Sequence, residues 1–273
     1  MKPLIFPLYL LLALFLLTGC QQSHRQGIIA LETDKKKGND TTAFSEQEIY
    51  LRSKKHLDSV FNANQETETF SLNLINGAVH IGHLFTPTAK DAVLGYYEND
   101  SVLNVIVLRR SFGRWDTLMK ERICPARQGA LFMDDAYTFS DWNGDGIPDL
   151  KVIKDQWEMH TGEISDLWTY QDNRFIKVKG FDKIISAQYD KKTRLIYSYM
   201  STGCADMSMY FGVFKITGSE ARPVKQLNCD CCNGDSCTIT INGLQPYNVP
   251  IGQAYKHVPA YFAEGVKEKC LMK

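Results

Sequence analysis

The hydrophobic pattern takes on a period of two after the first quarter of the chain, and this change limits the fold more than any other feature. Phe70, Leu72 and Leu74 alternate with polar residues, which is the pattern of a strand with one buried face. Asn76-Gly77 follows them and is typical of a tight hairpin turn. Short runs rich in β-branched and aromatic residues then recur between polar turns: 92–97, 102–108, 150–153, 167–170, 175–178, 195–200, 210–216 and 238–241. The pattern predicts a mainly β fold built from antiparallel hairpins.

A longer repeat underlies these runs. Asp91 and Asp149, 58 residues apart, each precede a strand-like run, a polar turn, a second run, another polar turn and an aromatic residue, Trp115 or Phe175. A third unit, 195–224, has the same rhythm without the aspartate. Several strands per unit at such a period favour a β-propeller-like fold. A multi-sheet meander of strands is the alternative.

Two helices are expected at the ends of the strand-rich region. Ser45 and Glu48 have the spacing of a capping box, and apolar residues follow at helical spacing, so one N-terminal amphipathic helix is expected at roughly 46–62. Pro259 suits the first turn of a helix, and a short C-terminal helix is expected to run from it to Cys270.

The N-terminus has the layout of a secretory signal. Lys2 precedes an uncharged apolar run, Leu4 to Leu17, which is shorter than the roughly 20 residues of a membrane-spanning helix. The sequence Leu17-Thr18-Gly19-Cys20 resembles the lipobox of bacterial lipoproteins. This resemblance implies that residues 1–19 are a signal peptide and that Cys20 carries acyl chains such as palmitate. Two or more such chains anchor a protein stably to a membrane.

Lipidation implies a place in the cell envelope. Residues 20–44 are polar and are expected to form a flexible tether. Gln21 and Gln22 replace the aspartate that retains some lipoproteins at the inner membrane, so we expect the outer membrane, on its periplasmic or surface face. Beyond the tether, residues 45–226 are expected to form the β-rich domain, and 227–273 a Cys-rich extension packed on it.

Charge and motifs limit the function. The 31 basic and 31 acidic side chains balance, so the chain lacks the basic excess typical of nucleic-acid-binding proteins. The sequence has no G-x-S-x-G or H-E-x-x-H motif and no phosphate-binding glycine loop. We therefore expect a protein that is not an enzyme and does not bind nucleic acid.

The strongest local motif is Asp141-Trp142-Asn143-Gly144-Asp145-Gly146-Ile147-Pro148-Asp149. Calcium takes 6 to 8 oxygen ligands, and this loop offers oxygens at alternate positions. The expected ligands are the side chains of Asp141, Asn143, Asp145 and Asp149 and the carbonyl of Ile147. The alternative is a turn stabilised by its own Asp and Asn side chains.

The residues after the loop separate it from an EF-hand, because Val152 occupies the twelfth position, where an EF-hand has glutamate. The aspartate that begins a strand instead resembles the calcium loops of FG-GAP and VCBS-type β-propeller repeats. Residues 83–94 look like a degenerate copy, in which His83 and Asp91 match Asp141 and Asp149. Phe85 and Pro87 replace the middle ligands, so no metal is expected there.

The resemblance also suggests partners, because small envelope propellers of this kind include lysozyme inhibitors. No inhibitory motif carries over residue by residue. We expect a membrane-anchored, calcium-stabilised module that binds a protein or glycan in the envelope. An inhibitor of lysozyme or another hydrolase, and a structural or assembly component of an outer-membrane complex, are the alternatives.

Seven cysteines follow Cys20, and an oxidising compartment favours disulfides. An odd number leaves one thiol over. Adjacent cysteines pair only with strain, so Cys231 and Cys232 are expected to bond elsewhere, and the connectivity stays open. A zinc or iron–sulfur cluster between Cys229 and Cys237 is the alternative. The candidates are Cys124, Cys204, Cys229, Cys231, Cys232, Cys237 and Cys270.

Overall fold

The computed structural model describes residues 57–59, 61, 69–74, 77–130, 136–157 and 162–271. The chain divides into two units, Met1–His56 and Leu57–Lys273, and the described residues all belong to the second. The expected signal peptide, Cys20 and the tether lie outside the described residues. Of the expected helix 46–62, residues 57–59 and Phe61 are helical, and the remainder lies outside the described residues.

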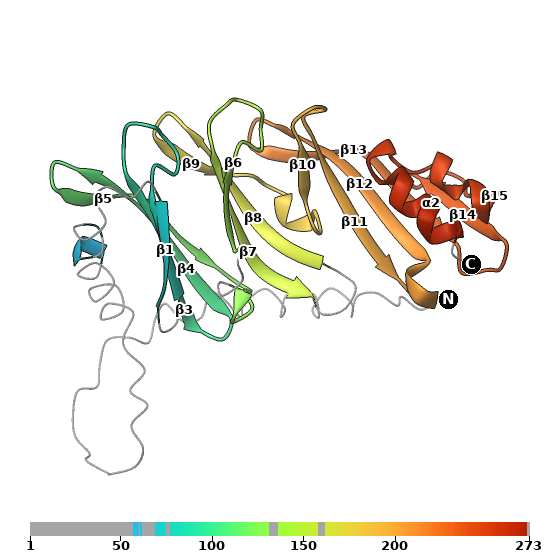
Figure 1. The fold of residues 1–273 in the computed structure, drawn as a ribbon, viewed down its shortest axis with the longest axis horizontal. Coiled ribbons are helices and arrows are strands. Elements are labelled where there is room, and N and C mark those ends of the chain that lie inside the picture. The colour runs from blue at the N-terminus through green and yellow to red at the C-terminus, as the bar shows by residue number, and fades with distance from the viewer. Residues whose placement is uncertain are drawn as a thin grey trace, which may run out of the picture. The chain divides into compact units, whose positions relative to one another are not determined.

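The described strands form three antiparallel sheets, and in each sheet strands that follow one another in sequence are neighbours (Figure 1). The first sheet holds β1 (Thr69–Leu74), β2 (Gly77–Gly82), β3 (Asp91–Asn99), β4 (Val102–Ser111) and β5 (Arg114–Ile123). The second holds β6 (Tyr137–Ser140), β7 (Asp149–Trp157), β8 (Gly162–Gln171) and β9 (Arg174–Lys177). The third holds β10 (Gln188–Asp190), β11 (Leu195–Thr202), β12 (Ser208–Thr217), β13 (Glu220–Asp230), β14 (Ser236–Ile241) and β15 (Tyr247–Pro250). The expectation of a mainly β, multi-sheet meander is confirmed.

Burial explains which strands the sequence reveals. The first seven residues of both β3 and β4 are buried, so these strands read as continuous apolar runs. In β5 buried residues such as Trp115 and Met119 are separated by more exposed ones such as Arg114 and Lys120, because one face of this strand meets solvent.

Apolar clusters connect neighbouring sheets. Val93 and Val105 of the first sheet pack in one cluster with Leu150 and Trp168 of the second. A second cluster lies between the second and third sheets and includes Leu167 of β8, Phe181, Ile196 of β11 and Phe214 of β12. Phe181 belongs to the short helix η3 (Phe181–Lys183) and has no exposed surface.

The C-terminal residues continue the third sheet and cover it. The expected boundary between 226 and 227 falls inside β13, and β14 and β15 extend the same sheet. The short C-terminal helix is confirmed: α2 (Ala263–Leu271) follows Pro259 and buries Val266 and Cys270. The remaining helical turns are η4 (Cys204–Asp206), η5 (Ile251–Lys256) and η6 (Ala260–Phe262).

Of the two expected Asn-Gly turns, the structure describes both residues of the second only, because Asn76 lies outside the described residues. Asn242 and Gly243 have φ angles of 51° and 68° and form the turn after β14, as the sequence predicts. Gly77 is instead the first residue of β2 and pairs with Leu74. A Cβ at Gly77 would lie 2.1 Å from the carbonyl oxygen of Gly95, so close packing against β3 requires glycine here.

Phe181→Ala tests the cluster between the second and third sheets. It should lower the free energy of unfolding by about 3–5 kcal/mol, because it leaves a cavity in a fully buried site. Val224→Ala is the control, since Val224 is 55% exposed and the change should stay within about 0.5 kcal/mol. Urea unfolding of both variants measures the effect, and equal losses would contradict this packing.

Candidate functional site

The 141–148 loop joins β6 to β7, and Asp149 pairs with Ser140 as the first residue of β7. The carboxylate of Asp141 accepts hydrogen bonds from the backbone of the loop. Its Oδ1 accepts hydrogen bonds from the backbone N–H groups of Gly144 at 2.6 Å and Asp145 at 3.1 Å, and its Oδ2 accepts one from Gly146 at 2.8 Å. Gly144 and Gly146 have φ angles of 83° and 87°, a region that favours glycine, so the two glycines allow the backbone to wrap around the carboxylate.

Asn143 and Asp145 form the outer part of the loop. The side-chain oxygen of Asn143 accepts from the N–H of Asp145 at 2.9 Å, and its amide donates to Oδ2 of Asp145 at 2.8 Å. Oδ1 of Asp145 accepts from the N–H of Ile147 at 2.8 Å. In this conformation the side-chain oxygens bind backbone N–H groups, as in the turn considered as the alternative to a calcium site.

Asp149 lies at the base of the loop with no exposed surface. Its Oδ2 accepts from the N–H of Trp142 at 2.8 Å, and its Oδ1 accepts from the N–H of Tyr170 on β8 at 3.1 Å. Burial raises the pKa of this carboxyl to about 6; the two N–H donors oppose the rise, and the negative charges of Asp145 and Asp141 add to it. The loop therefore places three acidic groups close enough for their charges to interact.

Among the described residues, no cationic side chain forms an ion pair with these acids. Among the ion pairs of the described residues, none has Asp141, Asp145 or Asp149 as its acid. Within the same part of the chain, the groups of three His, Cys, Asp or Glu residues with ligand atoms within 4.8 Å of one another all contain cysteines. The three carboxylates are thus neighbours, but they do not meet at one point in this conformation.

The loop is also packed into the protein. Trp142 is 6% exposed, and its ring lies 5.4 Å from that of Phe181 and 6.0 Å from that of Tyr189 on β10. The hydroxyl of Tyr189 and the side chain of Arg194 approach Gly144 closely. The position of the loop is therefore coupled to the packing between the second and third sheets.

The β2–β3 hairpin of the first sheet is built in the same way. Gly82 pairs with Asp91 just as Ser140 pairs with Asp149, and the loops 83–90 and 141–148 have the same length. Asp91 also has no exposed surface. The degenerate copy seen in the sequence is therefore a matching hairpin with a buried aspartate at the same place.

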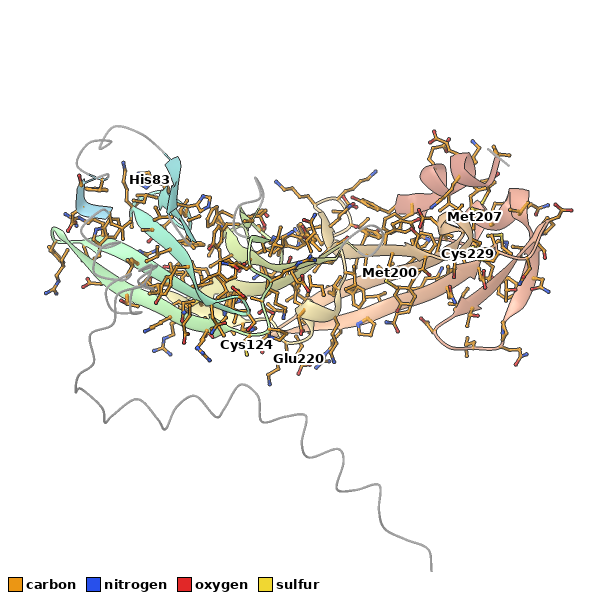
Figure 2. All side chains as sticks on the ribbon, turned by 90° about the horizontal axis from the view of Figure 1, so that it is seen from below. His83, Cys124, Met200, Met207, Glu220 and Cys229 are labelled. Atoms are coloured by element: carbon orange, nitrogen blue, oxygen red, sulfur yellow. A yellow bond between two sulfur atoms is a disulfide. The ribbon has the colours of Figure 1, made fainter. Side chains whose placement is uncertain are left out.

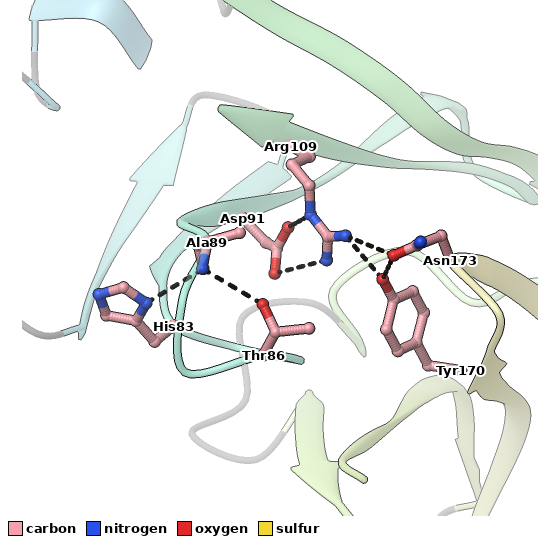
Figure 3. A network of polar contacts seen from close by, with 7 residues as sticks. All are labelled: His83, Thr86, Ala89, Asp91, Arg109, Tyr170 and Asn173. Atoms are coloured by element: carbon pink, nitrogen blue, oxygen red, sulfur yellow. Dashed lines mark hydrogen bonds and ion pairs between the residues drawn. The ribbon is translucent and has the colours of Figure 1, made fainter. Parts of the chain in front are cut away.

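The two copies differ in what faces the aspartate. Arg109 on β4 donates from Nε to Oδ1 of Asp91 at 2.7 Å and from Nη2 to Oδ2 at 3.3 Å (Figure 3). Its Nη1 donates to the hydroxyl of Tyr170 at 2.7 Å and to the side-chain oxygen of Asn173 at 3.0 Å. Burial raises the pKa of Asp91, and the hydrogen bond and charge of Arg109 oppose the rise. In this hairpin a guanidinium balances the buried carboxylate.

The sequence analysis did not predict this network, although the pairing of two strands gives one signal for it. Asp91 and Arg109 are directly paired across β3 and β4, so the correct register would have placed them together. Tyr170 and Asn173 come from the second sheet, and no local pattern connects them to Arg109. His83, the other residue matched to the motif, is exposed and its Nδ1 lies 3.1 Å from the carbonyl of Ala89.

The cysteines form bridges in the third sheet. Disulfides join Cys204 to Cys232 and Cys231 to Cys237, so the two adjacent cysteines bond elsewhere, as expected. Cys229 is a buried thiol whose Sγ lies 3.6 Å from that of Cys231. Burial and the neighbouring Cys270 raise its pKa to about 12.

Cys229 lies with Met207 in the C-terminal part of the protein (Figure 2). The Sγ atoms of Cys229, Cys231 and Cys237 lie within 4.8 Å of one another. The disulfide occupies two of these sulfurs and leaves one thiol, whereas a structural zinc site needs four ligands. Cys270 is buried on α2, and Cys124 follows β5 and is partly buried.

Comparisons with known proteins assign no family. No family model matches the chain, and no curated protein matches it. A solved structure described as a Xanthomonas type IV secretion system related protein is similar over 66% of this chain and 92% of its own, with 14% identity and a TM-score of 0.39. At this TM-score the likeness supports neither a fold assignment nor a function. No helix in the described part of the chain is long and apolar enough to cross a membrane.

Arg109→Met tests whether Asp91 depends on a cation. It should lower the free energy of unfolding by about 3–5 kcal/mol, because it leaves a buried carboxylate unbalanced. The double change Asp91→Asn with Arg109→Met should be less harmful than the single one. Arg222→Met, which removes an exposed pair with Glu220, is the control and should cost at most about 1 kcal/mol. Urea unfolding measures the effects, and a double variant no more stable than Arg109→Met alone would contradict the pairing.

The raised pKa of Asp149 predicts a pH dependence in the presence of a chelator. Its pKa lies near 6 in the folded chain and near 3.9 in an unfolded one. The folded state then holds the extra proton, so stability falls as pH rises from about 4 to about 7, by on the order of 3 kcal/mol. Asp149→Asn should remove this part of the profile. Denaturation in EDTA across this range measures it, and matching profiles for the two proteins would refute the assignment.

Proposed function

We propose that this chain is a lipid-anchored module of the bacterial envelope that uses a calcium-stabilised array of β-sheets to bind a protein or glycan partner. The observation that carries the calcium part is the buried Asp149, which lies near Asp141 and Asp145 and which no cationic side chain of the described residues pairs with. The anchor part rests on the sequence of the N-terminus.

The two matching hairpins supply the argument for a cation. In the first, Arg109 balances the buried Asp91. In the second, the equivalent Asp149 accepts hydrogen bonds from two backbone N–H groups, and two further acids lie nearby. A buried carboxylate without a counter-charge is costly, and a divalent cation would supply the charge that arginine supplies in the first hairpin.

The loop fits a hard cation by its chemistry. Asp141, Asn143 and Asp145 would contribute side-chain oxygens, Ile147 its carbonyl, and Asp149 one or both carboxylate oxygens, in keeping with the oxygen ligands that calcium prefers. To bind the ion, Asp141 and Asp145 would turn from backbone N–H groups toward it. Calcium would then lower the electrostatic repulsion between the acids and hold the start of β7 in place.

The role proposed for calcium is structural. Trp142, between two of the proposed ligands, packs against Phe181 and Tyr189, so fixing the loop would also fix the contact between the second and third sheets. For the finer fold, we propose that the three meander sheets are successive propeller-like blades. The matching β2–β3 and β6–β7 hairpins support this proposal.

The anchor part rests on the Leu17-Thr18-Gly19-Cys20 sequence. Acylated Cys20 would hold the module at the outer membrane, and residues 20–44 would tether it. Such a protein meets envelope proteins and glycans at short range. Inhibition of a lysozyme-like hydrolase is one concrete version of such partner binding.

Calcium addition tests the proposal. At a free concentration of about 100 times the dissociation constant, binding to the folded state alone adds about 2.7 kcal/mol. In a domain of this size that raises the melting temperature by roughly 5–10 °C. Calorimetry and thermal melting in calcium, magnesium and EDTA measure binding and stabilisation.

Asp145→Asn is the informative variant, because Asp145 is exposed and its loss should not unfold the chain. It should weaken calcium binding by more than tenfold and shrink the stabilisation. Asp116→Asn, an acid on β5 outside the loop, is the matched control and should behave as the unaltered chain does. A melting curve that calcium leaves unchanged would refute the calcium part of the proposal.

A further inference from the structure

The two disulfides described in the third sheet start from adjacent residues, Cys231 and Cys232, but lie in opposite surroundings. Cys231 and Cys237 have no exposed surface and belong to the apolar cluster that includes Val266 of α2. Cys204 is exposed, and its partner Cys232 is partly buried. A disulfide is opened by a thiolate that reaches one of its sulfur atoms. A thiol in solution therefore meets the Cys204–Cys232 bridge first.

Cys204 lies in a turn with an unfavourable backbone conformation. Residues 203–207 connect β11 to β12 and include the helical turn η4. Within it, Ala205 has φ 56° and ψ 45°, and Asp206 has φ 63°. The left-handed region is costly for residues with a Cβ; Asp can offset part of the cost with local hydrogen bonds of its side chain, whereas Ala has no polar side chain. The turn therefore carries backbone strain at Ala205.

The bridge is one of two ties that fix this turn to the end of β13. The disulfide attaches Cys204 to Cys232. At the other end of the turn, the carbonyl of Met207 accepts a hydrogen bond from the N–H of Cys231 at 2.9 Å. Strained backbone persists where the surrounding structure imposes it, and it is frequent at functional sites. Opening the bridge would remove one tie and let Ala205 leave the left-handed region.

The buried bridge is protected from outside and from within. No surface of Cys231 or Cys237 meets solvent. The Sγ of Cys229 lies 3.6 Å from that of Cys231, so an internal thiol is placed beside this bridge. Burial raises the pKa of Cys229 to about 12, and the thiolate rather than the thiol is the nucleophile. The chain thus carries a built-in reference for the exposed bridge.

We propose that the Cys204–Cys232 bridge is a redox-active disulfide that exchanges with a dithiol, while the Cys231–Cys237 bridge stays closed. This assignment is independent of the proposed calcium and partner binding. Strained or exposed disulfides are the labile ones among protein disulfides, and this bridge is exposed and attached to a strained turn.

The exchange takes two steps and needs no other reactant. One thiolate of the dithiol attacks the Sγ of Cys204, the bond between Cys204 and Cys232 breaks, and the Sγ of Cys232 leaves with the electron pair. The second thiolate of the dithiol attacks its own sulfur in the mixed disulfide and releases Cys204. The dithiol is oxidised to a disulfide, and its two protons end on the two cysteines. The carboxylate of Asp230, with an oxygen within 4.8 Å of both sulfurs, disfavours negative charge there, so the released sulfurs finish as thiols.

A redox titration tests the proposal. The mature chain, purified in detergent, is equilibrated with reduced and oxidised dithiothreitol over a range of ratios, quenched in acid, alkylated and mapped by mass spectrometry. The labelled fractions of Cys204 and Cys237 report the two bridges separately. The Cys204–Cys232 bridge should be half-reduced at a ratio at least about 30-fold lower than the Cys231–Cys237 bridge. Circular dichroism should show the fold intact while the first bridge alone is open.

A second arm separates two sources of the dithiol. Reduced thioredoxin replaces dithiothreitol and presents the same chemistry on a protein. Reduction of the Cys204–Cys232 bridge in both arms would support exchange with protein dithiols, and reduction by dithiothreitol alone would support exchange with small dithiols.

Ala205→Asn is the informative variant, because Asn tolerates positive φ and the change leaves both sulfurs in place. It should raise the ratio that half-reduces the Cys204–Cys232 bridge about fivefold, since less strain is released on opening. Phe112→Asn is the matched control. Phe112 is an exposed residue with φ 46° in the turn between β4 and β5 of the first sheet, so its change should shift the ratio by less than about twofold.

Three results would overturn the inference. Equal ratios for the two bridges would remove the distinction between them. Loss of the fold when the Cys204–Cys232 bridge opens would make that bridge a structural one. An equal shift in the Ala205→Asn and Phe112→Asn variants would show that strain in the 203–207 turn does not act on the bridge.

Discussion

A carboxylate buried at the first residue of a strand needs positive charge or hydrogen-bond donors around it, and the structure meets this requirement twice in different ways. Asp91 and Asp149 both begin a strand after a loop of the same length, and neither has exposed surface. Arg109 balances the first. The second is surrounded by backbone donors and further acids. This difference, rather than the presence of acidic residues as such, is the physical basis for the proposed calcium.

Packing between the sheets connects the 141–149 loop to the rest of the fold. Each pair of sheets that follow one another in sequence shares an apolar cluster. Trp142 of the 141–149 loop is part of the cluster between the second and third sheets. The proposed module thus rests on apolar packing that continues from the first sheet to the third.

Much of the fold was readable from the sequence, because buried strands leave continuous or alternating apolar runs. The eight runs expected as strands all fall wholly or largely within β3, β4, β7, β8, β9, β11, β12 and β14. Strands such as β5 and β13 were missed because long polar side chains interrupt them. Of the site, the loop and its matching copy were visible as a motif. Arg109 and Tyr170 were not, because their contact depends on how two sheets pack. The positive φ of Phe112, 46°, could not be predicted either, since Phe-Gly does not by itself specify a turn with positive φ.

Tyr170 of β8 contacts polar groups of both hairpins. Its backbone N–H binds Asp149, while its hydroxyl binds Arg109, which in turn holds Asp91. The start of β7 and strand β4 are therefore connected by hydrogen bonds through one residue, which is also part of the apolar cluster between the two sheets. Tyr170 therefore links polar groups of the first and second sheets. We expect the first sheet not to unfold independently of the second. Cooperativity between sheets would then come from this tyrosine as well as from apolar burial.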